Sequence, residues 1–159
     1  GAAAYEKRGV AVTVPRWIPE NCIQCNQCAY VCPHATIRPF LLNEAETAAA
    51  PAAAKFAPKT IGKGLEGYKF MQSISPLDCM GCGLCVGVCP AKTKALEMVP
   101  QEEEAAQQEV FNYCVEKVTK KETPFKKESV KGSQFEQPLL EFSGSCAGCA
   151  ETSYARLIT

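Results

Sequence analysis

The pattern of apolar and polar residues predicts three short strands. β-Branched and apolar residues fill 10–14, and similar stretches follow at 68–75 and 96–99. These stretches flank two cysteine-rich loops, each of which ends in a Cys-Pro pair. The chain therefore contains an internal repeat of strand, loop, Cys-Pro turn and strand.

A longer segment with helical spacing follows the second half of the repeat. Val110, Cys114 and Val118 recur on one face, which predicts a helix over 101–121. A polar connector at 126–131 is expected to be a solvated linker. Acidic residues at the start of the helix and basic residues at its end would complement the helix dipole. These charges are Glu102, Glu103 and Glu104, and then Lys117, Lys120 and Lys121.

Charge and composition exclude several classes of protein. The 159 residues carry 17 basic and 17 acidic side chains, which argues against a general binder of nucleic acid or of membrane surfaces. The sequence has no apolar run of about 18 residues, so we expect no membrane span. The chain opens with Gly1, and we expect it to be a piece of something longer.

The most specific feature is the cysteine pattern C-x2-C-x2-C-x3-C-P, which occurs twice. This spacing is the signature of bacterial 4Fe–4S proteins with two clusters, in which the fourth cysteine of each run binds the other cluster. The first predicted ligand set is Cys22, Cys25, Cys28 and Cys89, and the second is Cys32, Cys79, Cys82 and Cys85. So many thiols in cluster spacing imply a reducing, cytoplasmic setting.

Two other uses of these cysteines fit the pattern less well. Zinc sites use C-x2-C pairs, but they require neither a third cysteine two residues later nor the C-x3-C-P ending. A disulfide framework suits small secreted domains, and this chain is long and has no signal peptide.

Prolines and glycines are expected to shape the cysteine loops. Pro33 and Pro90 should end the short helical turns that carry Cys32 and Cys89, because proline biases the preceding residue toward extended backbone. Glycines give the second loop room for backbone to approach sulfide closely. They are Gly81, Gly83 and Gly87.

Five further residues near the cysteines or the helix carry predictions. Trp17 should pack as core beside a cluster. Asn21 and Asp78 precede the first cysteine of each run, and each either accepts loop N–H groups or is a solvated turn residue. His34 is expected at the surface beside a cluster, and Cys114 as a small buried hydrophobe rather than a ligand.

Residues 43–67 are an insertion between the two halves. Alanine dominates 45–57, and Pro51 and Pro58 break any long helix. We expect a low-complexity surface excursion that either covers a cluster edge or contacts a neighbouring domain.

A third cysteine pair, Cys146 and Cys149, lies in a loop of small residues. Two cysteines are only half of a 4Fe–4S site, and no other pair remains to complete it. Either the remaining ligands lie on sequence absent here, or the pair is a redox or zinc C-x2-C pair.

The chain resembles the pyruvate:ferredoxin oxidoreductase family in three stretches, 5–9, 17–28 and 130–135. The last of them is followed by Cys146-Ala147-Gly148-Cys149, which also resembles the family. The resemblance covers nearly the whole chain and is least informative over the alanine-rich insertion. It implies a ferredoxin-like domain with two 4Fe–4S clusters, followed by the opening of a thiamine-diphosphate-binding domain. It also implies that Cys146 and Cys149 bind a third 4Fe–4S cluster whose other ligands lie outside this chain.

One motif departs from the family pattern. The family reads Cys-Gly-Glu-Thr-Pro where this chain has Cys149-Ala150-Glu151-Thr152-Ser153. Ala150 adopts positive φ less cheaply than glycine, which puts the loop conformation in doubt but not the two ligands. The resemblance places Glu151 and Thr152 on the thiamine side of the site.

The resemblance also implies a function. The full enzyme would convert pyruvate and coenzyme A to acetyl-CoA and carbon dioxide, with thiamine diphosphate and magnesium, as a homo-oligomer. This segment has no catalytic residue of its own and would relay single electrons through its clusters toward an external ferredoxin or flavodoxin. The residues alone leave two alternatives, a free-standing two-cluster ferredoxin with a C-terminal extension and a zinc-binding interaction module.

The predicted fold class is α+β, a bacterial-type 2×4Fe–4S ferredoxin-like domain with an insertion, a helix-containing connector and a fragment of a second domain. The lead-in strand occupies 1–15, and the ferredoxin-like domain occupies 16–100. The helix and connector follow at 101–138, and 139–159 begins the thiamine-diphosphate-binding domain.

Overall fold

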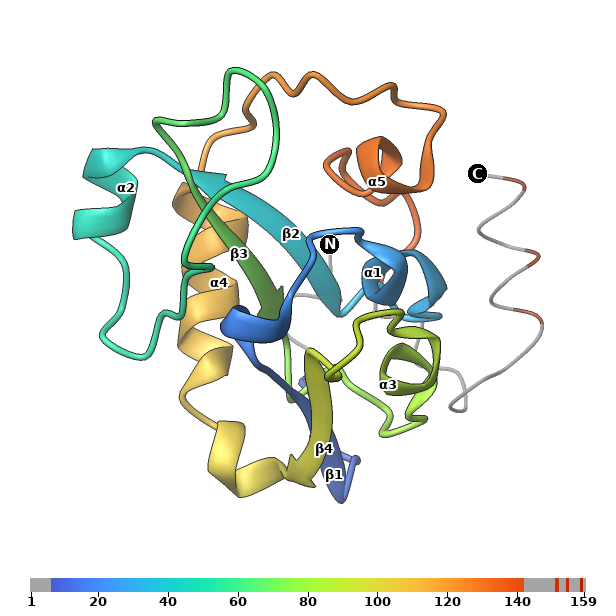
Figure 1. Cartoon of the computed structure of the whole chain (residues 1–159). Coiled ribbons are helices and arrows are strands. Elements are labelled where there is room, and N and C mark those ends of the chain that lie inside the picture. The colour runs from blue at the N-terminus through green and yellow to red at the C-terminus, as the bar shows by residue number, and fades with distance from the viewer. Residues whose placement is uncertain (1–6, 142–150, 152–153, 155–157, 159) are drawn as a thin grey trace.

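The computed structural model describes residues 7–141 together with Glu151, Tyr154 and Ile158. Two antiparallel strand pairs form its framework (Figure 1). Strand β1 (Thr13–Trp17) pairs with β4 (Leu96–Pro100), and β2 (Ile37–Leu42) pairs with β3 (Lys69–Ile74). Each pair joins a strand from the first half of the repeat to one from the second half, so the two halves are interleaved.

The strand predictions were correct for β3 and β4 but misplaced β1. The apolar stretch at 10–14 overlaps β1 only at its end, and β1 continues through Pro15 to Trp17. Val10 and Val12 are exposed instead. Proline is tolerated here because a strand in a two-stranded pair has one edge that forms no ladder hydrogen bonds.

Two short helices follow the cysteine loops and contact each other. Helix α1 (Gln27–Val31) is followed by Cys32, and α3 (Leu84–Val88) is followed by Cys89. Both cysteines have extended backbone, with ψ of 113° and 118°, directly before a proline. The Cys-Pro pairs therefore end the helices, as the sequence predicts. A short 3-10 turn, η2 (Pro19–Asn21), leads into the first loop.

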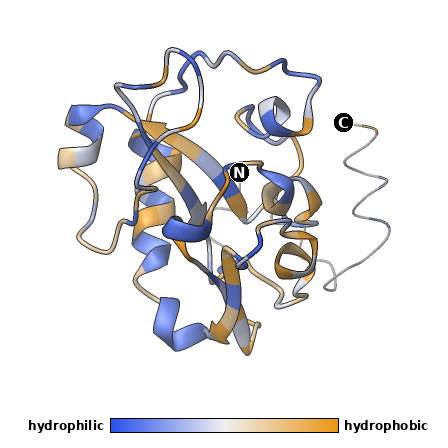
Figure 2. Ribbon diagram, in the orientation of Figure 1, coloured by the Kyte–Doolittle hydropathy of each residue, from blue (hydrophilic) through white to orange (hydrophobic). Residues whose placement is uncertain are grey.

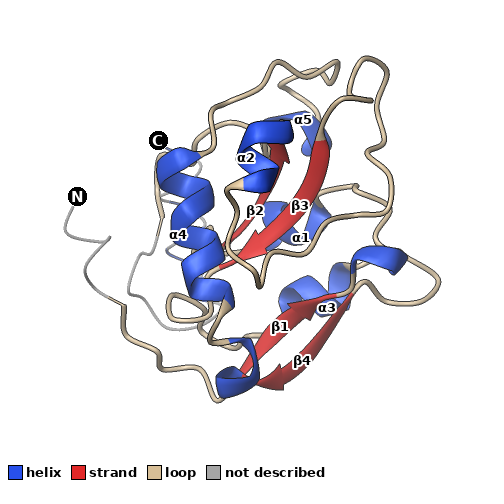
Figure 3. Cartoon of the chain, turned by 90° about the vertical axis from the view of Figure 1, so that its left-hand side faces the viewer, coloured by secondary structure: helices blue, strands red, loops and turns tan. Residues whose placement is uncertain are grey.

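Helix α4 (Gln107–Lys117) packs against β3 on the side away from α1 and α3 (Figure 3). It buries Val110, Phe111 and Cys114, the face that the sequence predicts.

The predicted helix over 101–121 was too long at both ends. A separate 3-10 turn, η3 (Gln101–Glu104), precedes α4. The Arg16 guanidinium donates to the carboxylates of Glu103 and Glu104 at 2.6 Å each, so these charges hold β1 rather than start a helix. Lys120 and Lys121 lie beyond the helix end and pair with other elements.

Helix α2 (Glu44–Ala48) begins the insertion and is tied to the segment after α4. Asn43 and Glu46 form a capping box at its start. The Glu46 carboxylate also accepts hydrogen bonds from Thr119 and from Lys121, the latter at 2.7 Å. Burial raises the pKa of Glu46, but these bonds outweigh it and hold the pKa at about 2.

Most of the rest of the insertion is exposed or half-buried, as the prediction of a surface excursion requires, but two of its residues reach the core. Ala57 and Leu65 are buried, and the Ala57 amide donates to the Phe70 carbonyl at 2.9 Å. A short polar or alanine-rich segment can be buried where its backbone pairs with a strand.

The connector also returns to the body of the molecule. Residues 126–130 are exposed, as predicted, but Lys131 is half-buried at the start of α5 (Val130–Ser133). Phe135 then stacks on Phe125, with ring centroids 6.0 Å apart, and meets the edge of Phe70 at 6.5 Å. The close turn requires Gly132, because a Cβ there would lie 2.0 Å from the Lys126 carbonyl oxygen.

The main core lies among β2, β3, α4 and the short helices, and it includes cysteines. Figure 2 shows that the η3 turn at the edge of the molecule is hydrophilic. Of the helices in the described part of the chain, none combines the length and apolar character needed to cross a membrane.

Candidate metal centre

Two cavities beside α1 and α3 are ringed by thiols. The cysteines lining the first cavity are Cys22, Cys25, Cys28 and Cys89, and those lining the second are Cys32, Cys79, Cys82 and Cys85. Each set takes three thiols from one run and the fourth from the other, which is the grouping that crossed ligation requires.

The two cavities adjoin. Cys28 and Cys85 lie near enough for one thiol to raise the pKa of the other. They are carried by α1 and α3, which contact each other. Contact between the helices therefore holds the two cavities side by side.

Left-handed backbone shapes both cysteine loops at equivalent positions. In the second loop, Gly81 and Gly83 have φ of +71° and +73°. In the first loop, Gln24 and Asn26 occupy the same positions with φ of 56° and 61°. Glycine adopts this conformation without strain, whereas other residues require compensation from their surroundings.

The side chains of Gln24 and Asn26 provide that compensation. The Gln24 amide donates to the Lys59 carbonyl at 2.5 Å and accepts from the Ile61 amide at 2.8 Å. The Asn26 amide donates to the Lys131 carbonyl at 2.9 Å. The first loop is therefore covered by the insertion and by the connector.

The second loop is covered on the side of Gly81, where an added Cβ would lie 3.0 Å from the Thr13 carbonyl oxygen and 3.4 Å from the Ala11 side chain. Cys82 and Leu84 are exposed, and a Cβ added at Gly83 would meet no atom within 4 Å. The two loops are thus alike in backbone and different in environment.

Backbone N–H groups point at the thiols. Gln24 N–H donates to Cys22 Sγ, and Gly81 N–H donates to Cys79 Sγ, each at 3.4 Å. Cys32 Sγ has two contacts from Thr36, the amide at 3.4 Å and the hydroxyl at 3.3 Å. Such donors favour a negatively charged sulfur.

Burial acts in the opposite direction on the free thiols. Burial, reinforced by neighbouring thiols, raises the pKa of Cys85 to about 12 and that of Cys79 to about 11. It also raises the pKa of Cys28 and of Cys22. Four thiols packed together in an apolar pocket need a cation among them before they ionise together.

The chemistry of this donor set fits a polynuclear iron–sulfur cofactor better than a single ion. Zn–S bonds of about 2.3 Å would bring four sulfurs to within about 4 Å of one another. Among the described residues, no group of three or more His, Cys, Asp or Glu side chains is arranged to hold one metal ion. The described cysteines are all free thiols.

Other predicted neighbours of the cysteines take varied places. Trp17 is buried and lines the first cavity, as expected. Asn21 donates its side-chain amide to the Lys94 carbonyl at 3.0 Å instead of accepting loop N–H groups. Asp78 is buried and accepts from the Ser75 hydroxyl at 2.5 Å, so it is not a solvated turn residue.

The prediction that His34 lies at the surface was wrong. His34 is buried and lines the second cavity, and burial lowers its pKa. It follows a Cys-Pro turn that folds back against the cavity, which a sequence pattern does not reveal.

The sequence analysis did not identify Gln72, Lys131, Gln24 or Asn26 as residues of the site. Gln72 comes from β3 and lines the first cavity. Lys131 lies near Cys22 and Cys25, which raise its pKa, although burial lowers it overall. Comparing the two cysteine runs position by position would have revealed Gln24 and Asn26, because glycines stand in their places in the second run.

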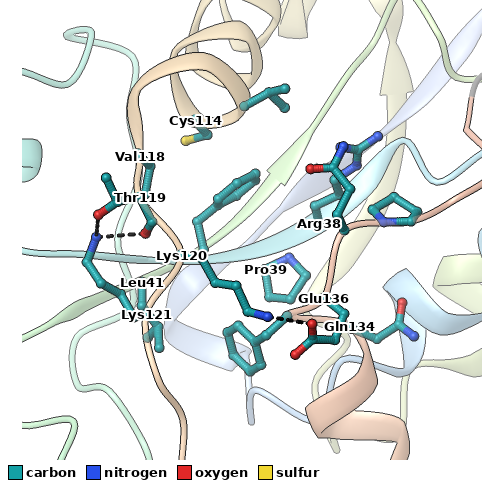
Figure 4. Close-up of a pocket in the computed structure, with 15 residues that line it drawn as sticks. Arg38, Pro39, Leu41, Cys114, Val118, Thr119, Lys120, Lys121, Gln134 and Glu136 are labelled. Atoms are coloured by element: carbon teal, nitrogen blue, oxygen red, sulfur yellow. Dashed lines mark hydrogen bonds and ion pairs between the residues drawn. The ribbon is translucent and has the colours of Figure 1, made fainter. Parts of the chain in front are cut away.

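A separate cavity lies between β2 and the connector (Figure 4). Cys114 borders it and is buried, as predicted. Its lysines have partners, since Lys120 pairs with Glu136 and Lys121 donates to Thr119. No cysteine of the two runs lines this cavity.

Comparison with known proteins agrees with the geometry. Residues 21–93 match the family described as "4Fe-4S dicluster domain". The whole chain is 56% identical, over 160 residues, to pyruvate:ferredoxin oxidoreductase of Moorella thermoacetica. The chain is homologous to a segment of pyruvate:ferredoxin oxidoreductase. It is also 55% identical to pyruvate-flavodoxin oxidoreductase of Klebsiella pneumoniae and 45% identical to mitochondrial pyruvate dehydrogenase [NADP(+)] of Euglena gracilis, again over its whole length.

This chain corresponds to a small part of those relatives. It spans 14% of the Moorella protein, 13% of the Klebsiella protein and 9% of the Euglena protein. Its ferredoxin-like dicluster domain is mixed α/β with two small sheets.

Four predicted residues of the oxidoreductase segment belong to its last part. Cys146, Cys149 and Thr152 lie outside the described residues. Glu151 is described and exposed.

Proposed function

We propose that this chain holds two 4Fe–4S clusters, one in each thiol-lined cavity, and relays single electrons within a larger pyruvate:ferredoxin oxidoreductase. The observation that carries this proposal is the sorting of the cysteines into two sets of four. The first cluster would bind Cys22, Cys25, Cys28 and Cys89, and the second Cys32, Cys79, Cys82 and Cys85. When bound, a 4Fe–4S cluster takes up and releases one electron at a time.

The protein contributes position, insulation and charge compensation. The αL residues of each loop turn the backbone so that N–H groups of Gln24 and Gly81 face Cys22 and Cys79. Apolar side chains such as Leu96 and Ile37 exclude water from the cavities. Contact between α1 and α3 keeps the two sites adjacent, which a relay of electrons requires.

The activity of the whole enzyme is part of the same proposal. The names of the relatives support pyruvate as the 2-oxo acid and ferredoxin or flavodoxin as the external acceptor. Coenzyme A, thiamine diphosphate and magnesium would act in domains outside this chain, in a cytoplasmic homo-oligomer. Cys146 and Cys149 would bind half of a third cluster, with Glu151 and Thr152 on the thiamine side.

Iron and sulfide analysis tests the proposal directly. The 159-residue chain, isolated without oxygen, should contain about eight irons and eight sulfides in its two clusters. It should also show a broad visible absorption that dithionite bleaches. A colourless chain loaded with zinc would contradict the proposal and favour an interaction module.

A further inference from the structure

Two buried side-chain donors face the first cavity without a protein acceptor. Trp17 is 5% exposed and Gln72 is 3% exposed, and both line the cavity with Cys22, Cys25, Cys28 and Cys89. Trp17 Nε1 and Gln72 Nε2 have no hydrogen-bond partner among the described residues. Buried N–H groups are nearly always paired, so each such exception requires an explanation.

Both side chains line the first cavity and also a smaller one with Glu104 and Gln107. Trp17 lies beside a thiol of the first set, since burial raises the pKa of Cys22 and the Trp17 indole lowers it. No protein acceptor lies at hydrogen-bonding distance and angle from the indole nitrogen. An acceptor inside the cavity would pair both donors.

We propose that Trp17 and Gln72 donate hydrogen bonds to the cluster in the first cavity and raise its reduction potential. This inference rests on the proposed binding of a cluster there. Reduction adds negative charge to a cluster, and hydrogen bonds to its sulfurs stabilise the more negative state. Two side-chain donors therefore favour the reduced state of this cluster.

The repeat places this pair of donors at the first cavity and not at the equivalent positions of the second run. Counted back from the first cysteine of each run, Gln72 corresponds to Pro15 and Trp17 corresponds to Ile74. Pro15 lines the second cavity, and neither proline nor isoleucine has a side-chain donor. The second cavity instead has the Thr36 hydroxyl, 3.3 Å from Cys32 Sγ.

Redox titration of the reconstituted chain, followed by electron paramagnetic resonance, tests the inference. Gln72→Leu and Trp17→Phe each remove one donor and keep a similar volume. Each variant should lower the reduction potential of one of the two clusters. The reduced-to-oxidised ratio of that cluster at a fixed potential should fall about tenfold, which corresponds to about 59 mV for a one-electron couple. The reduction potential of the other cluster should not change.

Two further variants serve as controls. Thr36→Val removes the hydroxyl beside Cys32 and should lower the reduction potential of the cluster in the second cavity. Gln107→Leu removes a half-buried amide that donates to the Ala53 carbonyl, and it should change neither reduction potential. If iron content is full and Gln72→Leu and Trp17→Phe leave both reduction potentials unchanged, or shift both equally, the inference is wrong.

Fluorescence gives a second test that does not depend on the variants. Trp17 is the only tryptophan in the chain, so its emission reports on the first cavity. Assembly of the clusters should quench it strongly. Unquenched emission at full iron content would overturn the inference, whereas a chain that takes up no iron would overturn the proposed function instead.

Discussion

Residues with left-handed backbone decide how each cysteine loop is built. Gly81 and Gly83 adopt positive φ without cost, and Gln24 and Asn26 adopt it while their side chains bind neighbouring segments. A non-glycine residue in this region costs about 1–2 kcal/mol, which hydrogen bonds of about 1 kcal/mol each can offset. The first loop therefore uses strained residues as anchors, whereas the second loop uses glycines and leaves Cys82 exposed.

Substitution at Gly83 tests this requirement. Gly83→Ala should lower the free energy of unfolding by about 1 kcal/mol, because φ is positive there and the added methyl meets no neighbour. Gly87→Ala is the matched control in the same loop and helix, and it should be neutral or stabilise by about 0.5–1 kcal/mol. Chemical denaturation of both variants gives the comparison. Equal effects at the two positions would contradict the backbone explanation.

The sequence predicts the residues that carry chemistry better than those that surround them. The cysteine runs repeat at fixed spacing, so their grouping into two sets follows from the pattern. Gln72 and Lys131 reach the first cavity from a strand and from a connector distant in sequence, and only the tertiary fold brings them there. His34 was misplaced for the same reason, since burial depends on how the chain folds back after Pro33.

At the scale of elements, charges join segments more often than they stabilise single helices. Arg16 of β1 holds Glu103 and Glu104, and helix α4 begins after them, later than periodicity predicts. Helix α2 is similarly joined to the segment after α4 through Glu46. Periodicity predicts the apolar face of α4 correctly because that face depends only on residues within the helix.

Removal of the Glu46 carboxylate should release α2. Glu46→Gln should lower the free energy of unfolding at neutral pH by about 1–2 kcal/mol, after allowance for solvent screening, because the bonds to Lys121 and Thr119 are charge-assisted. Glu44→Gln, on the exposed side of the same helix, should change it by less than about 0.5 kcal/mol. Thermal unfolding of the two variants measures the difference. Similar losses of stability in both would contradict the role of Glu46 in joining α2 to the segment after α4.

At the scale of the whole molecule, the cysteine sets and the strand pairs both combine residues from the two halves of the repeat. Metal binding contributes to folding wherever ligands come from separate segments. Neither half should therefore be stable without the other, and damage at one site should spread to its neighbour.

Cysteine substitution measures that coupling. Cys25→Ser and Cys82→Ser should each impair one cluster directly and lower the thermal stability of the whole chain by several degrees. Electron paramagnetic resonance of the reduced variants should show a disturbed second cluster as well. Cys114→Ser, which changes a buried thiol outside both cavities, should leave both cluster signals intact. If Cys25→Ser leaves the signal of the second cluster and the thermal stability of the chain unchanged, the crossed ligation of the two clusters is wrong.

The pairing of β1 with β4 also bears on how such a module is joined to other domains. Thr13, at the start of β1, lies opposite Pro100, at the end of β4. The chain therefore enters and leaves the dicluster domain at neighbouring points, as in domains that tolerate insertion into a host protein. A host protein that carried such a domain in a surface loop would keep the two ends of that loop close together.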